Sequence, residues 1–167
     1  MTRRTFVKST AAATGLGALP SLATASDAAA EPLTFSRYAI CNETFRDWPQ
    51  EKIFHFAAEC GYQGVEIAPF TIDHDVRNVT ATRRAELRKH AENAGVEIVG
   101  LHWLLSKTEG LHLTSPDAET RRRTADYLGE LARFCHELGG NVMIFGSPQQ
   151  RNLAEGVSPS QGMEYAA

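Results

Sequence analysis

Three times along the chain, a helical stretch of sequence leads into a glycine and then into a short apolar run. The runs are GYQGVEI at residues 61–67, GVEIVGL at 95–101 and GGNVMIF at 139–145. A glycine there is typical of a helix C-terminus, where a left-handed residue is needed. The apolar run after it is typical of a buried parallel strand. The pattern predicts repeated helix–strand units, preceded by a first strand at about residues 37–42.

Polar residues predict where the helices begin. Asp47 precedes a proline and has Gln50 three residues on, which indicates a capped helix start. Thr80 or Thr82 starts the next helix, Ser115-Pro116-Asp117 the longest one, and Ser158 a last one. The predicted order is therefore β-α-β-α-β-α-β, followed by the start of a fourth helix.

This alternation predicts a parallel sheet covered by helices, either an open doubly wound sheet or a closed (β/α)₈ barrel. No glycine-rich phosphate loop follows the first strand, where residues 41–45 read CNETF. We therefore predict an α/β fold with about four βα units of a partial (β/α)₈ TIM barrel over residues 36–167. Because a complete barrel takes about 250 residues, we expect this sequence to come from a truncated or frameshifted reading frame. Self-association of half-barrels into a homo-oligomer is the alternative.

The N-terminus has the features of an export signal. Adjacent arginines at positions 3 and 4 precede Phe6 and Lys8, and an alanine-rich, weakly apolar stretch follows at residues 11–22. Small residues then allow cleavage after position 25. This arrangement resembles a twin-arginine signal peptide, and the stretch is too short and too polar to be a stable membrane span. We expect residues 1–25 to be a signal peptide that sends the protein through the Tat pathway to the periplasm or the medium.

Residues 26–35 are small and polar and are expected to form a linker. Removing residues 1–25 takes away three basic residues and no acid, so the formal charge falls from −3 to −6. A mildly acidic chain lacks the basic surface of a nucleic-acid-binding protein. We therefore expect a small-molecule ligand and no nucleic-acid partner.

Three cysteines are too few and too irregularly spaced for a disulfide or zinc framework. Cys60 and Cys135 fall on the apolar stripes of predicted helices, so we expect both to be buried.

The candidate site residues follow from the rule that barrel active sites form at the carboxyl ends of the strands. Asn42 and Glu43 follow the first strand, Glu66 lies within the second, and His102 and Trp103 end the third. A carboxylate inside an apolar run needs a partner, because burying it alone costs several kcal/mol. Glu66 is therefore either a ligand-binding group or half of an internal ion pair. His102 beside Trp103 is either a hydroxyl-binding group next to an aromatic platform or an ordinary strand-end histidine.

Three segments carry a resemblance to a known family. They are ICNETF (40–45), ECGYQGVEIAPF (59–70) and VGLHWLLSKTEGLHLTSPD (99–117). They resemble the xylose-isomerase-like TIM barrel superfamily, and within it the sugar phosphate isomerase/epimerase type. Hydroxypyruvate isomerases, ketose 3-epimerases, inosose dehydratases and some DNA-repair endonucleases share this layout.

The resemblance implies an isomerase or epimerase of carbohydrate metabolism that moves a proton on the carbon next to a carbonyl. In the family, a divalent metal (Mn or Mg) polarises the carbonyl and glutamates carry the proton. The family's metal ligands come from strands five to eight, so no metal ligand and no catalytic residue is assigned in this chain. What carries over is a substrate-binding set for a sugar or hydroxy-carbonyl compound: Glu66, His102, Trp103, Asn42 and Glu43.

Three alternatives remain open. One is a non-catalytic, self-pairing half-barrel that binds carbohydrate. Another is an inosose dehydratase-like lyase. An endonuclease of the same superfamily is disfavoured by the acidic net charge.

Overall fold

The structure, a computed structural model, describes residues 37–167 of the chain. The expected Tat signal (1–25) and linker (26–35) lie outside the described residues, so both stay predictions. None of the helices formed by residues 37–167 is both long enough and apolar enough to cross a membrane.

Strands and helices alternate through the described residues. The strands are β1 (Ala39–Cys41), β2 (Gly64–Ile67), β3 (Glu97–His102) and β4 (Val142–Ile144). The helices are α1 (Gln50–Glu59), α2 (Ala81–Ala94), α3 (Ala118–Glu137) and α4 (Pro159–Ala166). Short 3₁₀ turns η1 (Asn42–Phe45), η2 (Pro69–Thr71), η3 (Val76–Asn78) and η4 (Pro148–Gln150) lie in the loops after the strands.

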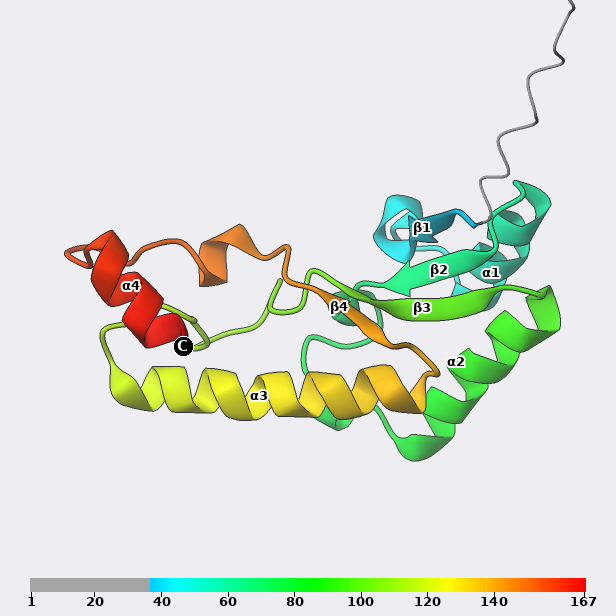
Figure 1. Cartoon of the computed structure of the whole chain (residues 1–167). Coiled ribbons are helices and arrows are strands. Elements are labelled where there is room, and N and C mark those ends of the chain that lie inside the picture. Colours follow the sequence, from blue (N-terminus) through cyan, green and yellow to red (C-terminus); the bar gives the residue numbers. More distant parts are fainter. Residues whose placement is uncertain (1–36) are drawn as a thin grey trace, which may run out of the picture. The chain divides into compact units, whose positions relative to one another are not determined.

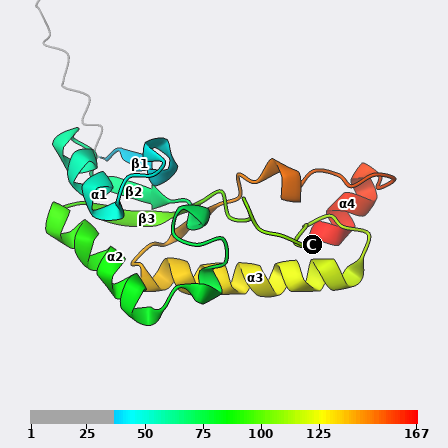
Figure 2. The same ribbon diagram turned by 180° about the vertical axis from the view of Figure 1, so that it is seen from behind.

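The four strands form one parallel sheet in the order β1-β2-β3-β4 (Figure 1). Each strand pairs with the next one along the chain, so every connection between neighbours carries a helix, as parallel pairing requires. The two opposite views show α1, α2 and α3 on one side of this sheet, and α4 beside the first turns of α3 (Figure 2). The predicted α/β arrangement of four βα units with parallel strands is confirmed.

The core lies between the helices and one face of the sheet. Alternate strand residues point to this face, among them Val65, Ile67 and Leu101, and all three are buried. They meet apolar residues of the helices such as Phe54 and Phe134, which are fully buried. A buried face of this size is what stabilises the helices, because isolated helices of such length are marginal in water.

Several predicted helix boundaries are confirmed by cap geometry. Thr80 accepts a hydrogen bond from Arg83 N at the start of α2, and Asp117 accepts from Glu119 N and Thr120 N at the start of α3. Ser158 begins α4 with a capping box. These helix starts are determined by hydrogen bonds between residues a few positions apart, so they can be predicted from the sequence.

Two local predictions were wrong. Asp47 does not cap the first helix, because a tight turn at residues 45–48 intervenes and α1 begins at Gln50, with Pro49 at the N-cap. Cys60 is exposed, because α1 ends at Glu59 and Cys60 is its C-cap residue. Cys135, which lies inside α3, is buried as expected.

The other face of the sheet is not covered by these helices. Strand alternation and the β2–β3 and β3–β4 registers put Glu66, His102, Val142 and Ile144 on it. All four are partly or largely exposed, whereas their neighbours on the helix side are buried or half-buried. The polar residues of this face therefore lie where a ligand can reach them.

Candidate functional site

Glu66 and His102 form the centre of the candidate site at the carboxyl end of the sheet. Glu66 pairs in register with Gly100, which has no side chain, so the carboxylate can extend toward His102 two residues on. His102 Nδ1 lies 3.8 Å from Glu66 Oε2, and the side chains are 25% and 23% exposed. Sequence reasoning placed both residues at strand ends, and the structure brings them together.

The imidazole of His102 lies close to residues of two loops. Trp103 meets the ring edge-on with centroids 5.7 Å apart, and a Cβ added at Gly146, in the loop after β4, would lie 3.6 Å from Cε1 and Nε2 of the ring. Nδ1 is buried and has no hydrogen-bond partner among the described residues. At 3.8 Å the carboxylate attracts a protonated ring without forming a hydrogen bond. The two groups are therefore close enough to influence each other's charge but do not form a direct hydrogen bond.

Cys41 ends β1 and pairs in register with Glu66. Burial raises the pKa of its thiol to about 11, and the carboxylates of Glu43 and Glu66 act in the same direction. A thiol with this pKa is protonated at neutral pH, so Cys41 is neither a nucleophile nor a ready metal ligand.

Asn42 is fully buried and acts as a hub between the first two βα units. Its Nδ2 donates to Gln50 Oε1 (2.9 Å) and Thr71 Oγ1 (2.7 Å), and its Oδ1 accepts from Ala68 N (2.8 Å). The predicted contact of Asn42 with a substrate stays a prediction, and the structure gives this side chain a framework role.

Trp103 borders a cavity of about 550 Å³ at the mouth of the sheet. The loops after β2, β3 and β4 all contribute to it, through residues that include His74, Glu109 and Gln149. Trp103 has a positive φ of 57°. A strained backbone conformation of this kind is more frequent at ligand-binding sites than elsewhere.

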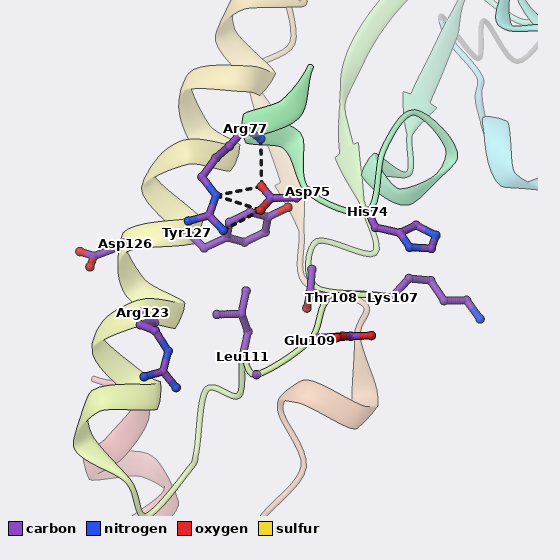
Figure 3. Close-up of a pocket in the computed structure, with 11 residues that line it drawn as sticks. His74, Asp75, Arg77, Lys107, Thr108, Glu109, Leu111, Arg123, Asp126 and Tyr127 are labelled. Carbon is purple, nitrogen blue, oxygen red and sulfur yellow. Dashed lines mark hydrogen bonds and ion pairs between the residues drawn. The ribbon is translucent and has the colours of Figure 1, made fainter. Parts of the chain in front are cut away.

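A second cavity, of about 380 Å³, lies between the loops after β2 and β3 and α3 (Figure 3). Arg77 binds both oxygens of Asp75 and holds the pKa of that carboxyl below its usual range. Tyr127 lies beside them, and its hydroxyl accepts from Val76 N, while burial raises its pKa. His74 and Lys107 project away from α3 in Figure 3. The Arg77–Asp75 pair thus lies within the loop, and the Tyr127 hydroxyl fastens that loop to α3.

The largest of the three cavities, about 980 Å³, contains Glu43. Glu66 and His102 are not among the residues that line this cavity, and the predicted action of Glu43 together with them stays a prediction. Sequence reasoning missed the other polar and aromatic residues of this cavity, among them Arg46, Trp48 and Phe70. Their positions directly after the first two strands could have identified them. Because the first helix was predicted to start at Asp47, the residues around it were assigned to a helix start and not to the site.

The described residues do not fit a metal centre. No group of three or more His, Cys, Asp or Glu side chains within residues 37–167 is arranged to hold a metal ion. Glu66 and His102 together offer two ligands at most, and stable protein sites for Mn²⁺ or Mg²⁺ use more oxygen ligands than this.

Comparisons with known proteins agree with this geometry. The sequence matches the model of the xylose isomerase-like TIM barrel family over residues 54–167. Among solved structures, it is similar to D-psicose 3-epimerase from Clostridium cellulolyticum H10, determined with D-tagatose, at 14% identity and a TM-score of 0.60. That match covers 78% of this chain and 44% of the epimerase chain, so it supports the fold alone. No curated protein matches the sequence.

Proposed function

Because the chain belongs to the xylose isomerase-like TIM barrel family, we propose that it is a sugar isomerase or epimerase. In the proposed reaction, a proton moves on the carbon next to the carbonyl of a ketose or a related hydroxy-carbonyl compound. The observation that carries the proposal is the Glu66–His102 pair, 3.8 Å apart on the open face of the sheet.

The two side chains supply complementary parts of such a proton transfer. The Glu66 carboxylate takes the proton from the carbon, and a ring N–H of His102 donates a hydrogen bond to the carbonyl oxygen as it gains negative charge. Delivery of the proton by Glu66 to the neighbouring carbon gives an isomer, whereas an epimer forms when a second proton donor, such as a water molecule, protonates the same carbon from the opposite face. A general base of this kind contributes roughly 10²- to 10⁴-fold to the rate.

The family's chemistry implies a divalent metal, but the described residues do not form a site for one. We therefore derive no step through a metal. Metal dependence is instead a variable in the experiment that follows.

The experiment measures exchange of the proton next to the carbonyl with solvent. The protein is incubated in D₂O with D-psicose or D-tagatose, with added Mn²⁺ or with a chelator, and deuterium uptake is followed by NMR. We expect exchange in the wild type and a loss of roughly 10²- to 10⁴-fold in Glu66→Gln.

Glu97→Gln is the matched control, because Glu97 begins β3 at the opposite end of the strand, where it pairs with Arg37 on the surface. It should exchange like the wild type. Absence of exchange in the wild type under both metal conditions, or equal exchange in Glu66→Gln, would contradict the proposal.

A second candidate function, a self-pairing carbohydrate-binding module, is favoured by one observation. Val142 and Ile144 are 46% and 38% exposed on β4, which has no further strand beside it among the described residues. An apolar strand edge of this kind invites pairing with another chain. A discrete dimer in sedimentation, together with sugar binding and no deuterium uptake, would support this function over the first.

A further inference from the structure

Residues with positive φ divide into two groups in the described part of the chain. Those outside glycine are Arg46, Trp103 and Lys107, with φ of 47°, 57° and 65°. All three lie in the loops that leave the carboxyl ends of β1 and β3. A side chain makes this backbone conformation costly, and glycine adopts it freely. These loops therefore keep strained side chains where a glycine would serve the turn better.

Arg46 is the more strained of the two cations. Its φ of 47° and ψ of −112° are those of the first central residue of a type II′ turn, a position dominated by glycine. Trp48 N donates to Phe45 O at 3.2 Å and closes this turn. Within residues 37–167 the guanidinium of Arg46 has no hydrogen bond, ion pair or ring contact. Nothing in the described part of the chain holds it in place, and it is free to bind a ligand.

Lys107 is held in its strained conformation by the loop beneath it. Leu105 is fully buried, its N–H donates to the buried Ser147 Oγ at 2.9 Å, and its carbonyl accepts from Thr108 Oγ1 at 2.7 Å. The loop cannot relax without breaking these bonds. The ammonium group of Lys107 is exposed and is likewise without a partner among the residues that the structure describes.

Arg46 and Lys107 come from different loops but line the same cavity of about 980 Å³. Two unpaired cations at one cavity favour an anionic group, which Arg can bind with two hydrogen bonds. The cavity also contains Glu43 and Asp47, whose carboxylates accept hydrogen bonds from hydroxyl groups, and the ring of Trp48. This mixture suits a compound that has both hydroxyl groups and one anionic group.

We propose that Arg46 and Lys107 bind the anionic group, a phosphate or a carboxylate, of a polyhydroxylated substrate. The inference rests on the proposed function, because it assigns the class of sugar that the proposed isomerase or epimerase binds. It makes Arg46 and Lys107 the residues that select a charged sugar over a neutral one.

The test uses glycine variants, because glycine relieves the strain and removes the charge together. Calorimetry compares the binding of a neutral ketohexose, the same ketohexose carrying a 6-phosphate, and a hexuronate. We expect the wild type to bind one of the charged sugars at least about tenfold more tightly than the neutral one. Arg46→Gly and Lys107→Gly should each lose about tenfold of this preference and unfold at an equal or higher temperature.

Two controls separate charge from strain. Lys107→Arg keeps the cation and should keep the preference for the charged sugar. Lys89→Ala removes an exposed cation from α2 and should change neither the preference nor the unfolding temperature appreciably. Glycine variants that become more stable but retain the full preference would overturn the proposal.

Inorganic phosphate distinguishes failure of this inference from failure of the proposed function. Phosphate should raise the unfolding temperature of the wild type and not that of the two glycine variants. If it does so while no ketose exchanges its proton, the anion site stands and the isomerase function fails. If a neutral ketose exchanges and the charged sugars bind no more tightly, the isomerase function stands and the anion site is wrong.

Discussion

Both ends of the sheet contain turns with positive φ, but the two ends use different residues at these positions. At the amino end, the chain turns from helix to strand through Gly61, Gly95 and Gly139, with φ of 85°, 76° and 91°. At the carboxyl end, positive φ falls on Gly110 and Gly156 and also on three residues with side chains, Arg46, Trp103 and Lys107. Glycine takes this conformation without strain, whereas each side chain adds about 1–2 kcal/mol. The amino-end turns named here avoid this strain, and the loops at the carboxyl end retain it at three side chains.

The two ends also differ in the hydrogen bonds that hold their loops and turns in place. At the carboxyl end, Asn42 ties the turn after β1 to the start of α1 and to the chain after β2 through Gln50, Thr71 and Ala68. At the amino end, the helix ends are satisfied by backbone hydrogen bonds such as Gly95 N to Glu92 O (3.1 Å). Removing a framework residue should therefore matter more at the carboxyl end.

The largest effect is expected for Asn42→Ala. The change leaves buried polar partners unsatisfied, each at about 1–3 kcal/mol, so we expect the free energy of unfolding to fall by about 3 kcal/mol. Urea denaturation followed by circular dichroism measures it. Asn93→Ala, at an exposed position near the end of α2, should change stability by less than about 0.5 kcal/mol. A similar loss in both variants would show that the Asn42 hub does not fasten the carboxyl end.

An intermediate effect is expected at the amino end for Gly95→Ala. An added Cβ at Gly95 meets nothing within 4 Å, so only its φ of 76° opposes the change, at about 1–2 kcal/mol. Gly129→Ala is the matched control, because Gly129 lies in α3, is exposed and also has open space around it. There alanine should stabilise the helix by about 0.5–1 kcal/mol. Thermal unfolding should show shifts of opposite sign, and shifts of the same sign would contradict the conformational argument.

The amino end was the more predictable of the two from sequence, because its features are local. A glycine after a helical stretch, or a threonine or aspartate before one, determines a cap within a few residues. The caps at Thr80, Asp117 and Ser158 were found for this reason. The same reasoning located the strands and hence the carboxyl-end positions of Glu66 and His102.

The carboxyl end was less predictable, because its features depend on residues distant in the sequence. Asn42 was expected to face a substrate, yet its partners Ala68 and Thr71 come from beyond the next strand. Nothing local indicates that Arg46 takes a glycine conformation, since the turn that requires it is set by the packing on either side. Cys60 was misplaced for a smaller reason, since α1 ends one residue earlier than its apolar stripe.

The two ends should also differ in the reactivity of their cysteine thiols, a difference that has little effect on stability. Cys41 ends β1 at the carboxyl end, and burial, with the nearby carboxylates of Glu43 and Glu66, raises the pKa of its thiol to about 11. Cys60 lies exposed at the amino end, next to Gly61. Since only the thiolate reacts, we expect iodoacetamide at pH 8 to alkylate Cys60 at least about tenfold faster than Cys41. Peptide mass mapping over time measures both rates in one sample.

The same raised pKa predicts how stability depends on pH. The folded state holds the Cys41 proton more tightly than the unfolded chain does. The stability that this adds is therefore complete below the ordinary thiol pKa of 9.0 and is lost as pH rises toward about 11. Other groups titrate in this range, so the quantity to compare is the urea midpoint of the wild type against that of Cys41→Ala. The wild type should lose slightly more stability between pH 9 and 11. Equal losses, or alkylation of Cys41 as fast as of Cys60, would mean that the Cys41 thiol is open to solvent and would contradict its raised pKa.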